Sequence, residues 1–71
     1  MLRTEWVRNK LREIGFTFVR QADRVTIWRN GTQRASLPRR DFMPESQARA
    51  LLEQAGVTSD EIERFLASVR I

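Results

Sequence analysis

The chain has 71 residues, of which 41% are hydrophobic, so we expect one small globular domain spanning residues 1–71. Cysteine, histidine and tyrosine are absent, which excludes disulfides, thiolate or imidazole zinc sites, and catalysis by cysteine or histidine. No apolar run approaches the roughly 20 residues that cross a bilayer, and the charged start of the chain does not resemble a signal peptide. We therefore expect a cytoplasmic domain with no cofactor, no metal and no membrane partner.

The basic residues are concentrated in the first part of the chain, and twelve of the 13 are arginine. Residues 1–40 carry ten basic and three acidic side chains, a net charge of +7, whereas residues 41–71 carry three basic and six acidic side chains, a net charge of −3. A guanidinium group binds two phosphate oxygens at once and stacks on bases, so this bias is typical of a face that binds a polyanion. The alternative is an arginine-rich but otherwise ordinary solvated surface.

In chain order, the apolar pattern first predicts a helix and then three strands. The helix is expected to have Thr4 as its N-cap and to end at Gly15. Its buried stripe would consist of Trp6, Val7, Leu11 and Ile14. Runs rich in β-branched and aromatic residues predict strands at 16–21, 25–29 and 32–37.

The second and third strands are expected to form a hairpin. The dipeptide Asn30-Gly31 predicts a two-residue type I′ turn, and Pro38 would end the third strand because it cannot donate to the ladder. The resulting pairs would be Arg29–Thr32, Trp28–Gln33, Ile27–Arg34, Thr26–Ala35 and Val25–Ser36.

The acidic half of the chain predicts two more helices. The first would start near Pro44 or Ser46 and end at Gly56, with a stripe made of Ala48, Leu51, Leu52 and Ala55. Residues 58–61 read as a capping box, with Val57 packing on Ile62 as a hydrophobic staple. The stripe of the last helix would be Ile62, Phe65, Leu66 and Val69. The order predicts an α+β fold, an α-β-β-β-α-α sandwich whose three-stranded antiparallel meander is covered by helices on one face.

The hairpin should have two different faces, since alternate residues of a strand point to opposite sides. The face under the helices would carry Thr26, Trp28, Ala35 and Leu37, with Trp28 in the core rather than serving as a stacking platform. The open face would carry Val25, Ile27, Arg29, Arg34 and Ser36. Exposed aliphatic groups bordered by arginine indicate a contact surface. A terminal helix or a second subunit covering the aliphatic residues is the alternative.

Six short motifs occur along the chain in a recognisable order. They are Leu11–Phe16 (LREIGF), Phe18–Gln21 (FVRQ), Ile27–Arg29 (IWR), Leu37-Pro38, Leu51–Val57 (LLEQAGV) and Asp60–Leu66 (DEIERFL). In this order they resemble the HicA (YcfA-like) toxins of bacterial type II toxin–antitoxin systems over nearly the whole chain. The resemblance implies a double-stranded-RNA-binding-domain-like fold, ribosome-independent cleavage of mRNA, and neutralisation by a HicB-like antitoxin.

The sequence departs from this family at the position of the catalytic residue. A Gly-Ser-His motif opens the second strand in the family, and its histidine is catalytic; here the matching residues are Asp23-Arg24-Val25, with Val25 at the histidine position. A valine cannot transfer a proton, and losing such a group typically lowers the rate by about 10²–10⁴-fold. The mRNA interferase activity of the family is therefore doubtful in this chain.

RNA contact is expected through the hairpin and the residues that follow it. The start of the second predicted helix reads Phe-Met-Pro-Glu-Ser (42–46) and offers no lysine cluster, so shape-directed binding of duplex RNA is not expected. The candidate nucleic-acid-binding residues are Arg20, Arg24, Arg29, Arg34, Arg39 and Arg40.

Three functions follow from these features. The first is a HicA-like RNA-binding protein with weakened or absent catalysis. The second is a protein-interaction module that binds an acidic partner, an antitoxin or a second copy, through Val25, Ile27, Arg29 and Arg34. A partner is also favoured because so short a chain without disulfides or metals has a marginal core. The third is a nuclease with an unfamiliar site, for which the candidate groups are Lys10, Asp23, Arg24 and Asp41.

Overall fold

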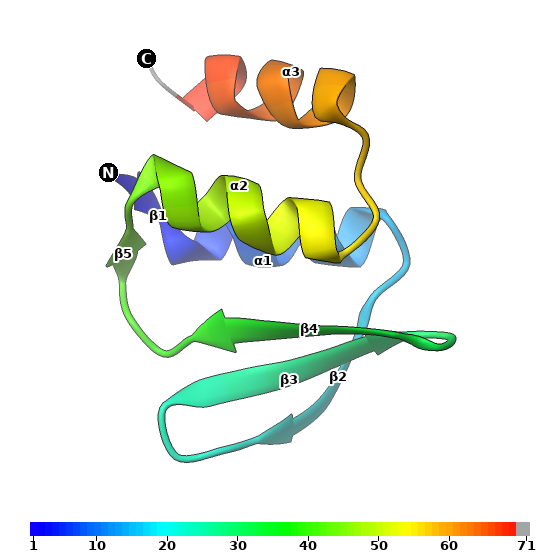
Figure 1. Ribbon diagram of the computed structural model, residues 1–71. Helices are drawn as coiled ribbons and strands as arrows, with labels where there is room; N and C mark the ends of the chain where they lie inside the picture. Colours follow the sequence, from blue (N-terminus) through cyan, green and yellow to red (C-terminus); the bar gives the residue numbers. More distant parts are fainter. Residues whose placement is uncertain (70–71) are drawn as a thin grey trace.

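The fold is a three-stranded antiparallel sheet with helices stacked on one side of it (Figure 1). The computed structural model describes residues 1–69. Its elements are β1 (Leu2–Arg3), α1 (Thr4–Glu13), β2 (Thr17–Gln21), β3 (Val25–Asn30), β4 (Gln33–Pro38), β5 (Phe42–Met43), α2 (Glu45–Gln54) and α3 (Ser59–Val69). The sheet has the order β2-β3-β4; α1 and α2 cover one face, and α3 packs on α2 away from the sheet. The predicted α+β class, the three-stranded meander and the three helices are confirmed.

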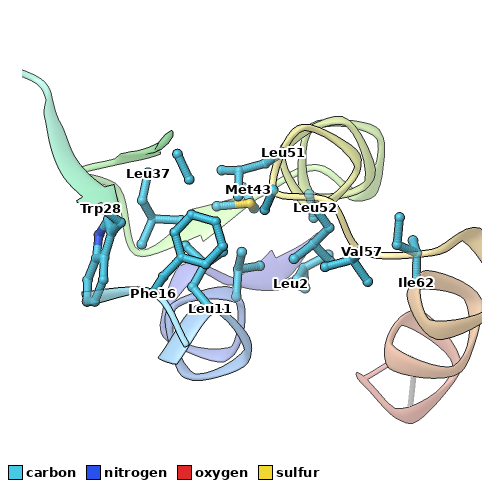
Figure 2. Packing of buried hydrophobic residues seen from close by; sticks show 14 of the residues in the cluster. Leu2, Leu11, Phe16, Trp28, Leu37, Met43, Leu51, Leu52, Val57 and Ile62 are labelled. Carbon is cyan, nitrogen blue, oxygen red and sulfur yellow. The ribbon is translucent and has the colours of Figure 1, made fainter. Parts of the chain in front are cut away.

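The core lies between the sheet and α1 and α2 and continues to α3 (Figure 2). It confirms the predicted stripes, with Trp6, Ile14, Phe65 and Val69 half-buried at its margin. Full burial of one large apolar side chain stabilises the fold by about 1.5–3 kcal/mol. The buried apolar residues are Leu2, Val7, Leu11, Phe16, Trp28, Ala35, Leu37, Met43, Ala48, Leu51, Leu52, Ala55, Val57, Ile62 and Leu66.

The first two helices end in the same way, at the glycines that the sequence predicted. Gly15 has a φ of 103° and Gly56 a φ of 87°, values that disfavour any residue with a Cβ. At the end of α1 the Phe16 N–H donates to the Leu11 carbonyl (2.9 Å) and the Gly15 N–H to the Arg12 carbonyl (3.1 Å). The equivalent bonds at the end of α2 are both 3.0 Å. These are Schellman motifs, which satisfy the last helical carbonyls and turn the chain sharply.

The helix starts agree less well with the sequence prediction. Thr4 is not the N-cap of α1; the cap is Arg3, and Thr4 is the first helical residue. The cause is a long-range contact, because β1 pairs with β5 and the Thr4 N–H donates to the carbonyl of Asp41 (3.0 Å). At α3 the predicted cap is confirmed, since the N–H of Glu61 donates to the hydroxyl of Thr58 (3.3 Å).

The hairpin is present, but its turn lies one residue later than predicted. Asn30 pairs with Gln33, so the turn residues are Gly31 and Thr32. Gly31 has a φ of 62°, whereas Thr32 does not have a positive φ, since all positive-φ residues within 1–69 are glycines. A type I′ turn needs a positive φ at both central residues and a type II′ turn only at the first, so this turn fits type II′. The predicted cross-strand partners are therefore wrong by two residues on β4; the observed pairs are Val25–Pro38, Thr26–Leu37, Ile27–Ser36, Trp28–Ala35 and Arg29–Arg34.

This even shift leaves the two faces of the hairpin as predicted, because side chains alternate with a period of two. Trp28, Ala35 and Leu37 are buried in the core. On the other face Arg29 and Arg34 are exposed.

A β-bulge in β2 was not predicted. Phe18 pairs with Trp28 and Arg20 pairs with Ile27, so Val19 has no partner of its own. Such an extra residue bends an edge strand and increases its twist.

Candidate nucleic-acid interface

Three arginines from three strands gather on the open face of the sheet. Arg20 comes from β2, Arg29 from β3 and Arg34 from β4, and they line a hollow of about 280 Å³ together with Val19 and Ile27. We call these three residues the hairpin arginines. The bulge at Val19 brings Arg20 opposite Ile27. The sequence predicted all three arginines but not the bulge that groups them.

In the part of the chain that the structure describes, the hairpin arginines have no acidic partner. Within residues 1–69, the salt bridges join Lys10 to Glu13 and Arg49 to Glu63, and none involves a hairpin arginine. Arg29 and Arg34 lie directly opposite each other on β3 and β4. Like charges at this position destabilise a sheet by roughly 0.2–1 kcal/mol. A bound anion would remove this repulsion, so the face is suited to a polyanionic ligand.

The other three predicted arginines form a second group at the opposite end of the hairpin. Arg24, Arg39 and Arg40 line a hollow of about 570 Å³ with Asp23, Val25, Pro38 and Gln47. We call them the loop arginines. Arg39 is held there, because its guanidinium donates to the carbonyl of Asp23 (3.2 Å) and its backbone N–H donates to the carbonyl of Arg24 (3.0 Å). The six candidate residues thus form two clusters along one face and its edge, not one patch.

Each of the two predicted partner-binding aliphatics lies in one of these clusters, Ile27 with the hairpin arginines and Val25 with the loop arginines. Val25 and Ile27 are half-buried on the open face, so neither is sealed inside the molecule. Val25 lines the same hollow as the loop arginines. Asp23 is the one carboxylate among the described residues lining that hollow.

Of the candidate catalytic groups, Asp23 and Arg24 share a hollow, whereas Lys10 and Asp41 lie elsewhere. Lys10 lies in a groove between α1 and α3, where its Nζ is 3.9 Å from the Glu13 carboxylate. Asp23 lies with the loop arginines, and Asp41 lies in a third hollow near the start of α1. Because Lys10, Asp23 and Asp41 face different hollows of the described structure (residues 1–69), they cannot act together on one scissile bond.

Trp28 is a core residue, as predicted. Its side chain is 2% exposed, and its indole N–H donates to the Thr26 hydroxyl (2.9 Å). The rings of Trp28 and Phe18 form a T-shaped pair with centroids 5.7 Å apart, and the Arg12 guanidinium lies 5.3 Å from the centroid of the Trp28 ring. Phe18 itself is 53% exposed and was not selected from the sequence. Its position in an edge strand is the signal that would have identified it.

The acidic residues have structural positions. Asp60 and Glu61 lie in the first turn of α3, where negative side chains favour the positive helix end. Among residues 1–69, no three acidic side chains lie close enough together to hold a metal ion. No helix in the same range is both long and apolar enough to cross a membrane.

No protein-family model, curated protein or solved structure matches this chain. The functional assignment therefore depends on the chemistry of the surface itself.

Proposed function

We propose that this chain is a HicA-like RNA-binding protein that contacts single-stranded RNA, such as mRNA, through the open face of its sheet. The observation that carries the proposal is the group of hairpin arginines around Ile27, which have no carboxylate partner within residues 1–69. Single-stranded RNA presents both phosphates and unstacked bases, and guanidinium groups bind the first and stack on the second.

The spacing of the two arginine clusters supports an extended ligand. The Arg29–Arg34 pair and the Val25–Pro38 pair are four residues apart along β3, a distance of about 13 Å. The hairpin arginines lie at one end of this span and the loop arginines at the other. An RNA strand running along β3 would bring several phosphates near both clusters.

The arrangement of the elements supports the finer fold that the resemblance implies. The order α1-β2-β3-β4-α2, with both helices on one face of an antiparallel sheet, is that expected for a double-stranded-RNA-binding-domain-like fold. On this proposal a HicB-like antitoxin binds the chain by covering its open face.

We further propose that the chain binds RNA without cleaving it. Val25 has no group that exchanges protons, and Lys10, Asp23 and Asp41 lie in separate hollows. Expression in a bacterial host should therefore leave growth and mRNA unaffected. Growth arrest with mRNA cleavage that Lys10→Ala or Arg24→Ala abolishes would contradict this and support an active nuclease.

RNA binding is tested by fluorescence anisotropy with a labelled single-stranded oligonucleotide at several salt concentrations. Contact between the arginines and the phosphates releases cations that were bound to the RNA. Added salt opposes this release, so the affinity should fall as the salt concentration rises. The double variant Arg29→Gln/Arg34→Gln should bind about tenfold more weakly. It should also reduce the salt slope by about 1.4, since each phosphate contact on a single strand contributes about 0.7.

The matched control is Arg49→Gln/Arg64→Gln, on α2 and α3. Both double variants lower the formal net charge from +4 to +2, so an effect of overall charge would be the same in both. Equal losses of affinity, or binding that does not respond to salt, would contradict the proposal.

A protein-interaction module is the second candidate, and a specific observation favours it. Val25 and Ile27 are half-buried aliphatic residues bordered by Arg29 and Arg34, as at the centre and rim of many protein interfaces. Sedimentation of the protein, alone and with an acidic partner, tests this reading. A complex that Ile27→Asp disrupts while RNA affinity hardly changes would favour the second candidate over the first.

A further inference from the structure

We propose that β4 pairs with β4 of a second copy of this chain, so that two sheets join edge to edge in a symmetric dimer. β4 (Gln33–Pro38) is an outer strand of the sheet, and no strand within residues 1–69 pairs with its other side (Figure 1). The surface concerned is the edge of the strand and not the open face. The inference therefore goes beyond the proposed function and does not depend on RNA binding.

Every second residue of β4 directs its backbone groups away from β3. In an antiparallel pair of strands, residue pairs that exchange hydrogen bonds alternate with pairs that do not. The Arg39 N–H donates to the Arg24 carbonyl (3.0 Å), and this pair adjoins the pair Val25–Pro38, which fixes the alternation along β4. The residues whose backbone groups point to the free edge are therefore Arg34, Ser36 and Pro38.

This edge is regular and exposed. The pairing with β3 runs from Gln33 to Pro38 without a bulge, whereas β2, the other edge strand, is interrupted at Val19. Arg34 and Ser36 are both exposed, and their backbone groups bond to no other strand or loop within residues 1–69. A regular free edge of this kind is a template for a further strand.

The edge is complementary to itself when two copies run antiparallel with Ser36 on the two-fold axis. The Ser36 N–H of each copy then donates to the Ser36 carbonyl of the other. Each Arg34 N–H donates to the Pro38 carbonyl of the other copy. Proline has no N–H to offer in return, so it is accommodated at the end of the ladder and not at its centre. A two-fold interface repeats every contact, so the two copies exchange two bonds of each kind.

The charge of Arg34 selects this register. Arg34 of one copy lies opposite Pro38 of the other, so the two arginines are four residues, about 13 Å, apart along the strands. A register with Arg34 opposite Ser36 would place the two arginines on diagonal positions about 7–8 Å apart. A register with Ser36 opposite Pro38 would lose half of the hydrogen bonds, because proline cannot donate.

α2 runs alongside β4, so it would meet its counterpart in the second copy. Near one end of the strand, Gln47 lines the same hollow as Pro38. At the other end, a Cβ at Gly56 would lie 2.8 Å from the side-chain amide nitrogen of Gln33. The helix and the strand are therefore antiparallel neighbours over the length of β4.

The flank of α2 on this side is small and uncharged. Gln47 belongs to an exposed stripe with Ala50 and Gln54, at spacings of three and four residues. Arg49 lies on another side of the helix, where it pairs with Glu63 of α3. The centres of protein interfaces are depleted of charged residues, so the α2 helices of two copies can pack on this flank. Ala50 is about midway along the segment beside β4 and would lie nearest the axis.

The net charge of the chain opposes association. Each copy carries a formal charge of +4, so two copies repel each other at low salt. Salt screens this repulsion, and the dimer should become tighter as the salt concentration rises. RNA binding should respond in the opposite direction, which separates the two processes experimentally.

Sedimentation velocity over a range of concentrations tests the dimer. Ser36→Pro should weaken it at least tenfold, because it removes the two bonds on the axis and none to β3. The matched control is Gln21→Pro on the other edge. The Ala22 N–H donates to the Val25 carbonyl (2.8 Å), so by the same alternation the Gln21 N–H points outward, and this variant should still dimerise.

A second variant leaves the strand intact. Ala50→Glu sets two negative charges against each other near the axis and should weaken the dimer about tenfold. The control Ala67→Glu, at an exposed position of α3, changes the net charge equally, by −1, and should leave the dimer unaffected. Amide NMR spectra of all four variants show whether each is folded.

The register is read from isotope-filtered NOEs in a mixture of labelled and unlabelled chains. With Ser36 on the axis, Ala35 of one copy lies directly opposite Leu37 of the other, and their Hα atoms should give an NOE between copies. An NOE between Ala35 and Ala35 would instead show the register with Arg34 opposite Ser36 and overturn the proposed one.

The dimer is overturned if the chain sediments as a monomer at every concentration, or if Ser36→Pro and Ala50→Glu leave the dimer unchanged. A dimer that Ile27→Asp disrupts and Ser36→Pro does not would show association through the open face. A monomer whose Ser36 amide is protected from hydrogen exchange only by an added acidic protein would assign the edge to that partner. Failure of the proposed function is separate: the dimer can persist when no RNA binds, and RNA can bind to a monomer.

Discussion

The two faces of the β3–β4 hairpin are built from neighbouring residues and have opposite characters. Toward the helices, Trp28 and Leu37 are buried in the core. Their neighbours in the chain are exposed on the open face: Arg29 follows Trp28, and Ser36 precedes Leu37. The same pair of strands therefore provides the base of the core and the candidate binding surface.

The two faces therefore contribute differently to the stability of the fold and to ligand binding. The helix-facing side stabilises the fold by burying apolar area. The open side places like charges opposite each other, which destabilises the fold slightly. Substitutions on the first side should mainly change the free energy of unfolding, and substitutions on the second should mainly change ligand binding.

The largest effect is expected for Leu37→Ala. Leu37 is 1% exposed, so removing its side chain should lower the free energy of unfolding by about 2–5 kcal/mol. Urea denaturation measures this value. The control is Ile27→Ala on the opposite face, where the residue is only half-buried and the loss should be clearly smaller. Similar losses for the two variants would show that both faces are core.

A smaller effect is expected where the hairpin end contacts α1. The Asn30 amide donates to the carbonyl of Ile14 (3.2 Å), at the C-terminus of the helix. Asn30→Asp removes the donor and places a negative charge at the negative helix end, which should cost about 1–2 kcal/mol. Asn30→Ala removes only the hydrogen bond and should cost less. If Asn30→Ala is as destabilising as Asn30→Asp in denaturation experiments, the charge plays no part.

The smallest change in stability, with the opposite sign, is expected for Arg34→Glu. This substitution turns the repulsive pair with Arg29 into an attractive one and should stabilise the fold by about 0.2–1 kcal/mol at low salt. The same variant should bind RNA more weakly. Thermal unfolding at two salt concentrations, together with anisotropy, tests both effects. The control Arg49→Glu breaks the ion pair with Glu63 and should not stabilise.

Local signals in the sequence predicted most of the fold. Gly15 and Gly56 marked the helix ends because only glycine readily adopts the required φ. The predicted faces of the hairpin were also correct, although the predicted pairs were not. The turn was predicted at Asn30-Gly31 and lies at Gly31-Thr32, which shifts each partner by two residues. A shift of two leaves every side chain on its predicted face.

The features that the sequence did not predict depend on distant contacts. The start of α1 moves to Thr4 because β1 pairs with β5, about 40 residues away in the chain. The sequence predicts the arginines of the candidate site, but their division into two clusters follows from the bulge at Val19 and from the observed register. Neither has a local signature in the sequence.

The bulge in β2 has a consequence for how the protein behaves at high concentration. An edge strand with regular unpaired N–H and C=O groups is a template for another copy, and Phe18 and Val19 are exposed apolar residues on such a strand. Val19 interrupts the regular spacing of those groups. The strand can thus expose apolar side chains to water while pairing less readily with the edge strand of another copy, the step that begins a fibril.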